Sequence, residues 1–255
     1  MIPFFRKIRK NMIDDNSSQG RQVGSFKYLK YAAGEVALVV IGILIALQIN
    51  NWNEERKNRV LLHTYIESIS EDIKLDLLSF DSTIRTLRTQ VEAGDEIIPI
   101  MESEQRLISD SLKFILDFNR FTSTSKVPDR NTTWDFLNSS GVISDFPDTK
   151  LLKLLQDYYR NYAQLISNHE TSAIPARLEL RQLKYELFKD KEHKKFFPTR
   201  SPKAPGIEVY DAIFNDKRVL PLCRYIGSTA IFFEDRFNTL HGKASNIIDY
   251  IDTHF

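Results

Sequence analysis

The most apolar stretch of the chain is Ala32–Ile49. No polar side chain occurs within Val36–Leu47, and only Glu35 and Gln48 interrupt the longer run, both near its ends. A helix needs about 20 residues, with a range of about 17 to 25, to cross roughly 30 Å of hydrocarbon. Aromatic residues typical of a membrane interface stand on both sides of the run: Tyr28, Tyr31 and Trp52. The pattern predicts a transmembrane helix over residues 31–50.

Two other kinds of segment have apolar helices of similar length, the core helix of a soluble protein and a cleaved signal peptide. A soluble core helix is rarely apolar on every face over about three turns, as this run is. A signal peptide has a shorter segment before its apolar region and a small-x-small cleavage site after it, and Gln48–Trp52 offers no such site. The sequence therefore favours a permanent anchor over either alternative.

Positive charges are distributed unequally around the apolar run. Seven precede it: Arg6, Lys7, Arg9, Lys10, Arg21, Lys27 and Lys30. Three follow within a comparable stretch: Arg56, Lys57 and Arg59. Because Lys and Arg are enriched on the cytoplasmic side of membrane helices, the N-terminus is expected in the cytoplasm and residues 51–255 outside it. In a Gram-negative bacterium this topology means the inner membrane with most of the chain in the periplasm.

The cytoplasmic segment, residues 1–30, begins with an amphipathic pattern. Apolar residues recur at helical spacing: Phe4, Phe5, Ile8, Met12 and Ile13. Basic residues fall largely between them: Arg6, Lys7, Arg9 and Lys10. Each basic residue near an anionic lipid surface contributes about 1 kcal/mol to binding. We expect a short helix on the inner leaflet, followed by a polar linker.

Beyond the membrane, an apolar seam with nearly heptad spacing predicts one long helix. Its members are Leu62, Ile66, Ile69, Ile73, Leu77, Phe80, Ile84, Leu87 and Val91, with a stutter around Ile73–Leu77. Gly94 and Asp95 are expected to end this helix, and a second helix is expected over Pro99–Asn119. The seam suits either a coiled coil between chains or a packing face within one chain.

The remaining sequence predicts further helices joined by loops. Phe121–Thr133 has the composition of a loop, and Trp134–Asn138 that of a short helical turn ending at Gly141. Asp148 is expected to cap a helix with a face of Leu151, Leu155, Tyr159, Tyr162 and Ile166, and Pro175 either kinks this helix or starts a new one. The last helix is expected over Leu222–Thr253 and is long enough to pack along the helix after the membrane. The predicted fold class is all-α.

The composition of the chain argues against nucleic-acid binding and against an internal disulfide. The chain has 35 Lys and Arg against 34 Asp and Glu, whereas nucleic-acid-binding domains usually carry a marked positive excess, so no nucleic-acid partner is expected. A single cysteine, Cys223, cannot form an internal disulfide. The functional information must therefore lie in local patterns.

The membrane segment and its flanks resemble a known family. Two blocks carry the likeness, Lys30–Glu35 and Val40–Glu54, and Phe4–Arg9 fits as well. Weaker blocks follow at Leu137–Gly141 and Leu155–Tyr159. They resemble uncharacterised membrane proteins of Bacteroidota, chiefly flavobacteria, which are known only as a domain of unknown function. The resemblance implies location and anchoring, and brings no activity, cofactor or catalytic residue.

No catalytic motif appears in the sequence. The five His residues lack the spacing of a zinc protease or a di-iron site, and no phosphate-binding loop, dinucleotide fingerprint or nucleophile elbow occurs. The nearest metal-like groups are Asp190 with His193 and Asp249 with Asp252 and His254, which we interpret as surface residues. We therefore expect no catalytic, cofactor or metal site.

Two further segments admit a binding role as well as a structural one. Tyr158, Tyr159 and Tyr162 would line a pocket or, as aromatic residues at helical spacing usually do, fill a core. Lys189–Pro205 would form an anion-binding patch or a solvated loop, and its composition favours the loop.

The leading functional hypothesis is an interaction or scaffold protein that presents a helical surface to an envelope partner. The alternative is the ligand-binding half of a sensor that signals through a separate partner. We also expect a parallel homo-oligomer, most simply a dimer. Its membrane interface would be the helix face formed by Glu35, Val39, Gly42, Ala46 and Ile49, in which Gly42 and Ala46 form a small-x-x-x-small pair.

Overall fold

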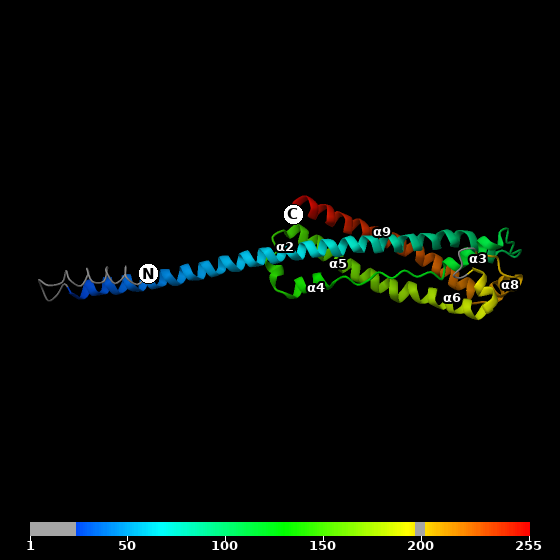
Figure 1. The fold of residues 1–255 in the computed structure, drawn as a ribbon, viewed down its shortest axis with the longest axis horizontal. Helices are drawn as coiled ribbons and strands as arrows, with labels where there is room; N and C mark the ends of the chain where they lie inside the picture. The colour runs from blue at the N-terminus through cyan, green and yellow to red at the C-terminus, as the bar shows by residue number, and fades with distance from the viewer. Residues whose placement is uncertain (1–23, 197–201) are drawn as a thin grey trace. The chain divides into compact units, whose positions relative to one another are not determined.

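The computed structural model describes residues 24–196 and 202–255 (Figure 1). The described residues form helices and loops and contain no strand, so the predicted all-α class is confirmed. The predicted membrane-surface helix with Arg6, Lys7, Arg9 and Lys10 lies outside the described residues. The chain divides into two compact units, Met1–Arg59 and Val60–Phe255, and the boundary falls within helix α2 (Gly24–Glu102).

The first unit contains the apolar run as part of α2. Every residue from Lys30 to Asn50 is exposed, including the large aliphatic side chains. Within the described residues, α2 is the one helix that is long and apolar enough to cross a membrane, and none of its apolar window is buried inside the protein. The run is therefore no core helix of this chain, and its length and composition fit a single-pass membrane protein.

The second unit is a bundle in which the Val60–Glu102 part of α2 packs with helices α5 (Thr149–Asn168), α6 (Ile174–Leu187) and α9 (Val219–His254). These long helices lie side by side in Figure 1. The shorter elements are α3 (Ser111–Arg120), α4 (Thr132–Ser139), the 3₁₀ helix η1 (Val142–Asp145), the π-helix η2 (His169–Ala173), α7 (Asp190–Phe196) and α8 (Ile207–Asn215).

The predicted seam on α2 forms the core face of this bundle. Leu62, Ile66, Ile69, Ile73, Phe80, Ile84 and Leu87 are buried, while Leu77 and Val91 are half-buried. Phe80 contacts Tyr162 of α5 and Phe237 of α9, with ring centroids 6.0 and 5.9 Å apart. The seam therefore packs within one chain, which decides between the two arrangements that the spacing allowed.

The predicted end of this helix at Gly94 is wrong, because α2 continues to Glu102 with Pro99 inside its last turn. A Cβ at Gly94 would lie 3.7 Å from the ring of Phe121 and 3.9 Å from the Cα of Gly227 on α9. These are ordinary van der Waals distances, so Gly94 is an interior position of α2 that would accept a Cβ and is no stop signal.

The second helix predicted over Pro99–Asn119 is also wrong. A loop separates α2 from α3, and α3 begins only at Ser111. Asp110 caps it, since its side chain accepts a hydrogen bond of 2.9 Å from the backbone N–H of Lys113. The Asp–Ser pair was a start signal for a helix that the apolar pattern alone placed too early.

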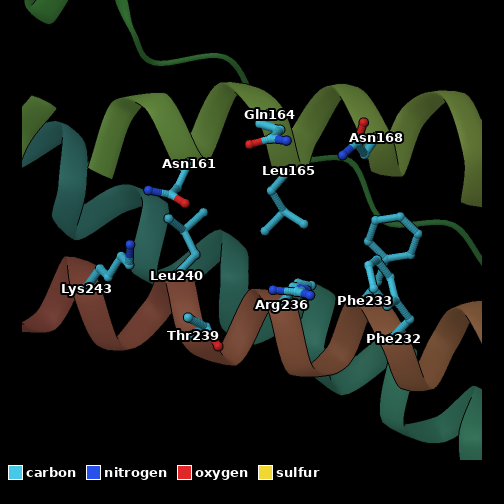
Figure 2. A pocket seen from close by; sticks show the side chains of 10 residues that line it. All are labelled: Asn161, Gln164, Leu165, Asn168, Phe232, Phe233, Arg236, Thr239, Leu240 and Lys243. Carbon is cyan, nitrogen blue, oxygen red and sulfur yellow. The ribbon is translucent and has the colours of Figure 1, made fainter. Parts of the chain in front are cut away.

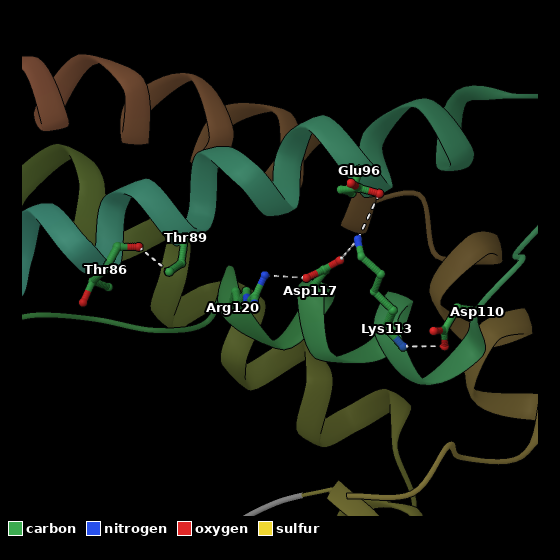
Figure 3. A network of polar contacts seen from close by, with 7 residues as sticks. All are labelled: Thr86, Thr89, Glu96, Asp110, Lys113, Asp117 and Arg120. Carbon is green, nitrogen blue, oxygen red and sulfur yellow. Dashed lines mark hydrogen bonds and ion pairs between the residues drawn. The ribbon is translucent and has the colours of Figure 1, made fainter.

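Ion pairs fasten α3 to α2 (Figure 3). Lys113 Nζ lies 2.9 Å from carboxylate oxygens of both Glu96 on α2 and Asp117 on α3. Asp117 is buried and also accepts from Arg120 at 2.7 Å. The two cations compensate the cost of burying this carboxylate, so the C-terminal turns of α2 and the whole of α3 form one corner of the bundle.

Several other predicted helix boundaries agree with the structure. Asp148 caps α5 by accepting from the backbone N–H groups of Lys150 and Leu151, at 2.8 and 2.9 Å, as predicted. Pro175 lies in the first turn of α6, after a π-helical turn. The last helix is confirmed and begins one turn earlier than predicted. The loop predicted over Lys189–Pro205 is wrong in its first half, which forms α7.

Candidate binding groove between α5 and α9

A groove of about 270 Å³ lies on the surface of the bundle, between α5 and α9 (Figure 2). Its walls are formed by residues of these two helices alone: Asn161, Gln164, Leu165 and Asn168 from α5, and Phe232, Phe233, Arg236, Thr239, Leu240 and Lys243 from α9. The two helices run in opposite directions here, because Asn161 faces the Lys243 end of the groove and Asn168 faces the Phe232 end.

Helical spacing explains why polar and apolar groups alternate in the groove. On α5, positions 161, 164, 165 and 168 share one face, and on α9 positions 232, 233, 236, 239, 240 and 243 do the same. Leu165, Phe233 and Leu240 are buried and form the floor. Phe232 is 51 % exposed and forms part of the rim. The groove therefore combines an apolar floor with a polar border.

One uncompensated charge stands in the groove. The guanidinium of Arg236 lies over the ring of Phe232, 5.1 Å from its centroid, and makes no ion pair among the described residues. Lys243 differs, since its Nζ lies 2.5 Å from a carboxylate oxygen of Asp157. Hydrogen bonds from Lys243 and Arg160 lower the pKa of the Asp157 carboxyl, which stays ionised at neutral pH. Arg236 is the cation left to meet a ligand.

Side-chain amides supply the remaining polar groups. Asn161 donates through Nδ2 to the backbone oxygen and a carboxylate oxygen of Asp157, at 2.5 and 3.1 Å. The exposed amides of Gln164 and Asn168 make no hydrogen bond to other described residues. Each of these two amides offers a donor and an acceptor side by side, as an extended peptide backbone does.

The groove ends where α5 passes into the π-helix η2. His169, the first residue of η2, is buried with its ring edge-on to Phe233 and Phe237, at centroid distances of 5.1 and 5.3 Å. Burial, with the nearby charge of Arg177, lowers the pKa of His169 to about 4. The imidazole is therefore neutral at pH 7 and fills space beneath the groove. Single π-helical turns are frequent at functional sites.

Buried cations of α6 hold the next part of the fold together. Arg177 is 1 % exposed and donates to Gln90 and to the carbonyl of Ala173, while burial lowers its pKa to about 10. Lys184 donates to Asn119 and Thr122, and burial, followed by the charge of Arg181, lowers its pKa to about 8. Because their partners are groups of the fold itself, we interpret these cations as structural.

A carboxylate and three tyrosines form a second buried polar cluster. Asp76 accepts from Tyr158 at 2.8 Å and from Arg130 at 2.9 Å, and burial raises its pKa. Tyr162 donates to the carbonyl of Pro128 at 2.7 Å, and Tyr159 stacks on Trp134 with ring centroids 4.9 Å apart. The structural interpretation of the tyrosines is confirmed, since all three are core residues.

A broader concavity of about 700 Å³ lies on the other side of α5, beside the extended segment 126–131. Its lining carries charges of both signs, Lys126 against Asp129 and Glu170. Tyr162, which lines it, uses its hydroxyl within the fold. The mixed charges give this surface no preference for an anion or a cation, so the α5–α9 groove is the stronger candidate.

Comparison with known protein families shows to which family the chain belongs. A family model, described as a family of unknown function (DUF6090), matches residues 35–176. The chain belongs to this family. The DUF6090 match covers the apolar run from Glu35 onward, the core seam of α2 and the whole of α5, and ends early in α6. It therefore includes the α5 wall of the groove and not the α9 wall. No curated protein and no solved structure matches the chain.

In this DUF6090 protein the residues of the predicted membrane interface belong to the first compact unit. Glu35, Val39, Gly42, Ala46 and Ile49 are exposed along α2, and a Cβ at Gly42 would meet no atom within 4 Å. This face is free to pack on another helix, and its use as an interface stays a prediction.

The candidate metal group of Asp249, Asp252 and His254 does not form a set of ligands in this DUF6090 protein. Among the described residues, no three His, Cys, Asp or Glu side chains lie together as metal ligands would. His193 stacks on Tyr185 with centroids 4.8 Å apart, and His254 stacks on Tyr250 at 4.1 Å. Asp249, Asp252 and His254 are exposed, as expected of surface residues, whereas His193 is half-buried and the side chain of Asp190 lies outside the described part of the structure.

The sequence interpretation missed the groove residues. Gln164, Asn168 and Arg236 have the polar character of any solvent-facing helix position. One feature of the sequence could have indicated them. They border the apolar faces of two long helices, and two packed helices leave a groove along such a border.

Proposed function

We propose that this DUF6090 protein is a single-pass inner-membrane protein with its N-terminus in the cytoplasm and residues 51–255 in the periplasm. The exposed apolar segment of α2 supports the membrane span, and the excess of basic residues before it supports the direction. In this topology the groove between α5 and α9 faces an extracytoplasmic space.

We further propose that the extracytoplasmic domain acts as an interaction or scaffold module for an envelope protein. The observation that carries this proposal is the pairing of an exposed Phe232 with an ion-pair-free Arg236 above an apolar floor. Aromatic residues and Arg dominate the binding energy of protein interfaces, especially around a pocket that a partner side chain fills. At about 270 Å³ the groove lies just below the range of about 300 to 1,000 Å³ usual for small-molecule sites.

A sensor is the second candidate, and the larger concavity beside the segment 126–131 favours it by volume. In this role the domain would bind a ligand and signal through a separate partner. The mixed charges of this concavity and the use of Tyr162 within the fold make it the weaker of the two.

We propose no enzymatic activity and no cofactor. Strongly shifted pKa values often mark catalytic groups. Among the described residues, burial is the first cause of each large shift, and the groups concerned are Tyr158, Tyr159, Tyr162, His169, Arg177, Lys184 and Cys223. These side chains are buried and bind or pack against groups of the same chain. Such an arrangement supports a structural role for these groups.

Purification of the full-length protein in mild detergent tests the interaction proposal. We expect one envelope protein to copurify in stoichiometric amount, and Phe232→Ala to reduce its recovery by about tenfold, a typical loss for an interface anchor. Ile231→Ala is the matched control, since Ile231 is also exposed, on the next position of α9, and lies outside the groove. A bound metabolite in native mass spectra without a protein partner would favour the sensor instead.

A further inference from the structure

We propose that the groove binds an extended segment of the partner protein in which an apolar side chain stands beside a carboxylate. This inference rests on the proposed interaction role and names the chemistry of the partner. It follows from the charge, the floor and the size of the groove.

The charge of the groove selects a carboxylate. Asp157 is already shared between Lys243 and Arg160, at 2.5 and 2.7 Å. The nearby Glu234 is paired with Arg88 at 2.9 Å. Among the described residues Arg236 makes no ion pair and no hydrogen bond through its side chain, whereas Lys243, the other charged residue that lines the groove, is paired with Asp157. A guanidinium matches the two oxygens of a carboxylate in a bidentate pair.

The floor of the groove selects an apolar side chain. Leu165, Phe233 and Leu240 form its base, and Phe232 stands at its edge with Arg236 over the ring. An aromatic or branched aliphatic side chain placed here would remove the rim of Phe232 from water. The volume of about 270 Å³ suits one anchoring side chain better than a whole ligand of drug size.

The amides favour a peptide over a free organic acid. Gln164 and Asn168 stand one turn apart on α5, with their side chains at the mouth of the groove (Figure 2). Their free donors and acceptors can pair with backbone N–H and C=O groups, which a simple carboxylate lacks. A peptide that uses all three features would bind the two amides through its backbone, the apolar floor through one side chain and Arg236 through its carboxylate.

Selection from a random-peptide library tests this inference on the full-length protein in lipid nanodiscs. Peptides are selected on the wild type and counter-selected on Arg236→Glu, and synthetic copies are measured by fluorescence anisotropy. We expect enriched peptides with an aromatic or aliphatic residue next to Asp or Glu. The dissociation constant should rise by at least about tenfold with Arg236→Glu and when the peptide acid is changed to its amide.

A matched charge reversal controls for nonspecific electrostatics. Arg85 is exposed on α2 and lies outside the groove, so Arg85→Glu should leave the dissociation constant unchanged. Basic consensus peptides, no enriched peptide, or equal binding by Arg236→Glu would overturn the inference. Equal affinity for N-acetylphenylalanine would also overturn it and assign the groove to a small acid. The interaction role fails separately, if no envelope protein copurifies with the wild type.

Discussion

Arg177 is hydrogen-bonded to Gln90 in the core of the bundle. The guanidinium of Arg177 donates through Nε and Nη2 to the amide oxygen of Gln90, at 2.9 and 2.6 Å, and both residues are buried. The amide nitrogen of Gln90 in turn donates to the carbonyls of Arg120 and Ser123, at 3.2 and 2.8 Å. One neutral side chain on α2 thereby supports a buried cation on α6 and the chain turn after α3.

Replacement of Gln90 should destabilise the bundle strongly. Gln90→Leu has a similar size but leaves a buried guanidinium and two carbonyls without their partner, so we expect a loss of about 3 kcal/mol in the free energy of unfolding. Arg88→Ala, which removes an exposed ion pair, should cost less than about 1 kcal/mol. Urea unfolding in detergent measures both. Equal small losses would show that the Arg177 site relaxes around a missing amide.

His169 should make the stability of the bundle depend on pH. Its pKa is about 4 in the folded chain against an ordinary value of 6.5, so the unfolded chain binds the proton more tightly. The stabilisation is complete above pH 6.5 and is lost as the pH falls toward 4. Between pH 7 and pH 5 the wild type should lose about 2 kcal/mol more than His169→Phe, which cannot titrate.

The measurement is urea unfolding of both proteins at the two pH values. Phenylalanine keeps the edge-on contacts with Phe233 and Phe237, so the variant should remain folded. A wild type and variant with the same pH dependence would mean that the buried ring is not the source of the effect.

Gly94 offers a test of how α2 ends. Because Gly94 lies inside the helix and an added Cβ would make ordinary contacts of 3.6 Å or more, Gly94→Ala should stabilise the bundle by about 0.5 to 1 kcal/mol. Gly141 is the matched control, since its φ of 74° disfavours any L side chain and Gly141→Ala should destabilise. Thermal unfolding measures both. A loss of stability with Gly94→Ala would restore the predicted helix stop.

The core face of α2 was predictable because apolar side chains recur there every three or four residues. The stutter at Ile73–Leu77 was visible too, but the burial of Asp76 within it was not. That carboxylate is tolerated in the core because Arg130 and Tyr158, 54 and 82 residues away in sequence, donate to it. Periodicity reports neighbours along a helix and contains nothing about such distant partners.

The groove was not predictable for a related reason. Gln164 and Arg236 are ordinary polar residues in their own helices, and they form one site only because α5 and α9 align in opposite directions at a particular register. Asp148 is the contrasting case. Its capping role depends on the backbone N–H groups two and three residues ahead, so local sequence was sufficient.

Reporter fusions should determine the topology. Because seven basic residues precede the apolar run and three follow it, we expect Phe255 outside the cytoplasm. A reporter active only in the periplasm should therefore be active when fused after Phe255 and inactive when fused before Met1. The reverse result would invert the orientation and turn the groove toward the cytoplasm.

Gly42 should control self-association through the membrane helix. Glu35, Val39, Gly42, Ala46 and Ile49 share one face, on which Gly42 and Ala46 allow close backbone approach. The seam beyond the membrane is used inside the chain, so this face is the remaining support for a parallel dimer. Since nothing lies within 4 Å of a Cβ at Gly42, Gly42→Ile leaves the single chain unstrained and blocks only a partner helix. We expect the signal of a membrane two-hybrid assay to fall by about tenfold, while Leu44→Ile on the opposite face changes it little. Equal signals from the wild type and Gly42→Ile would exclude this face as the interface.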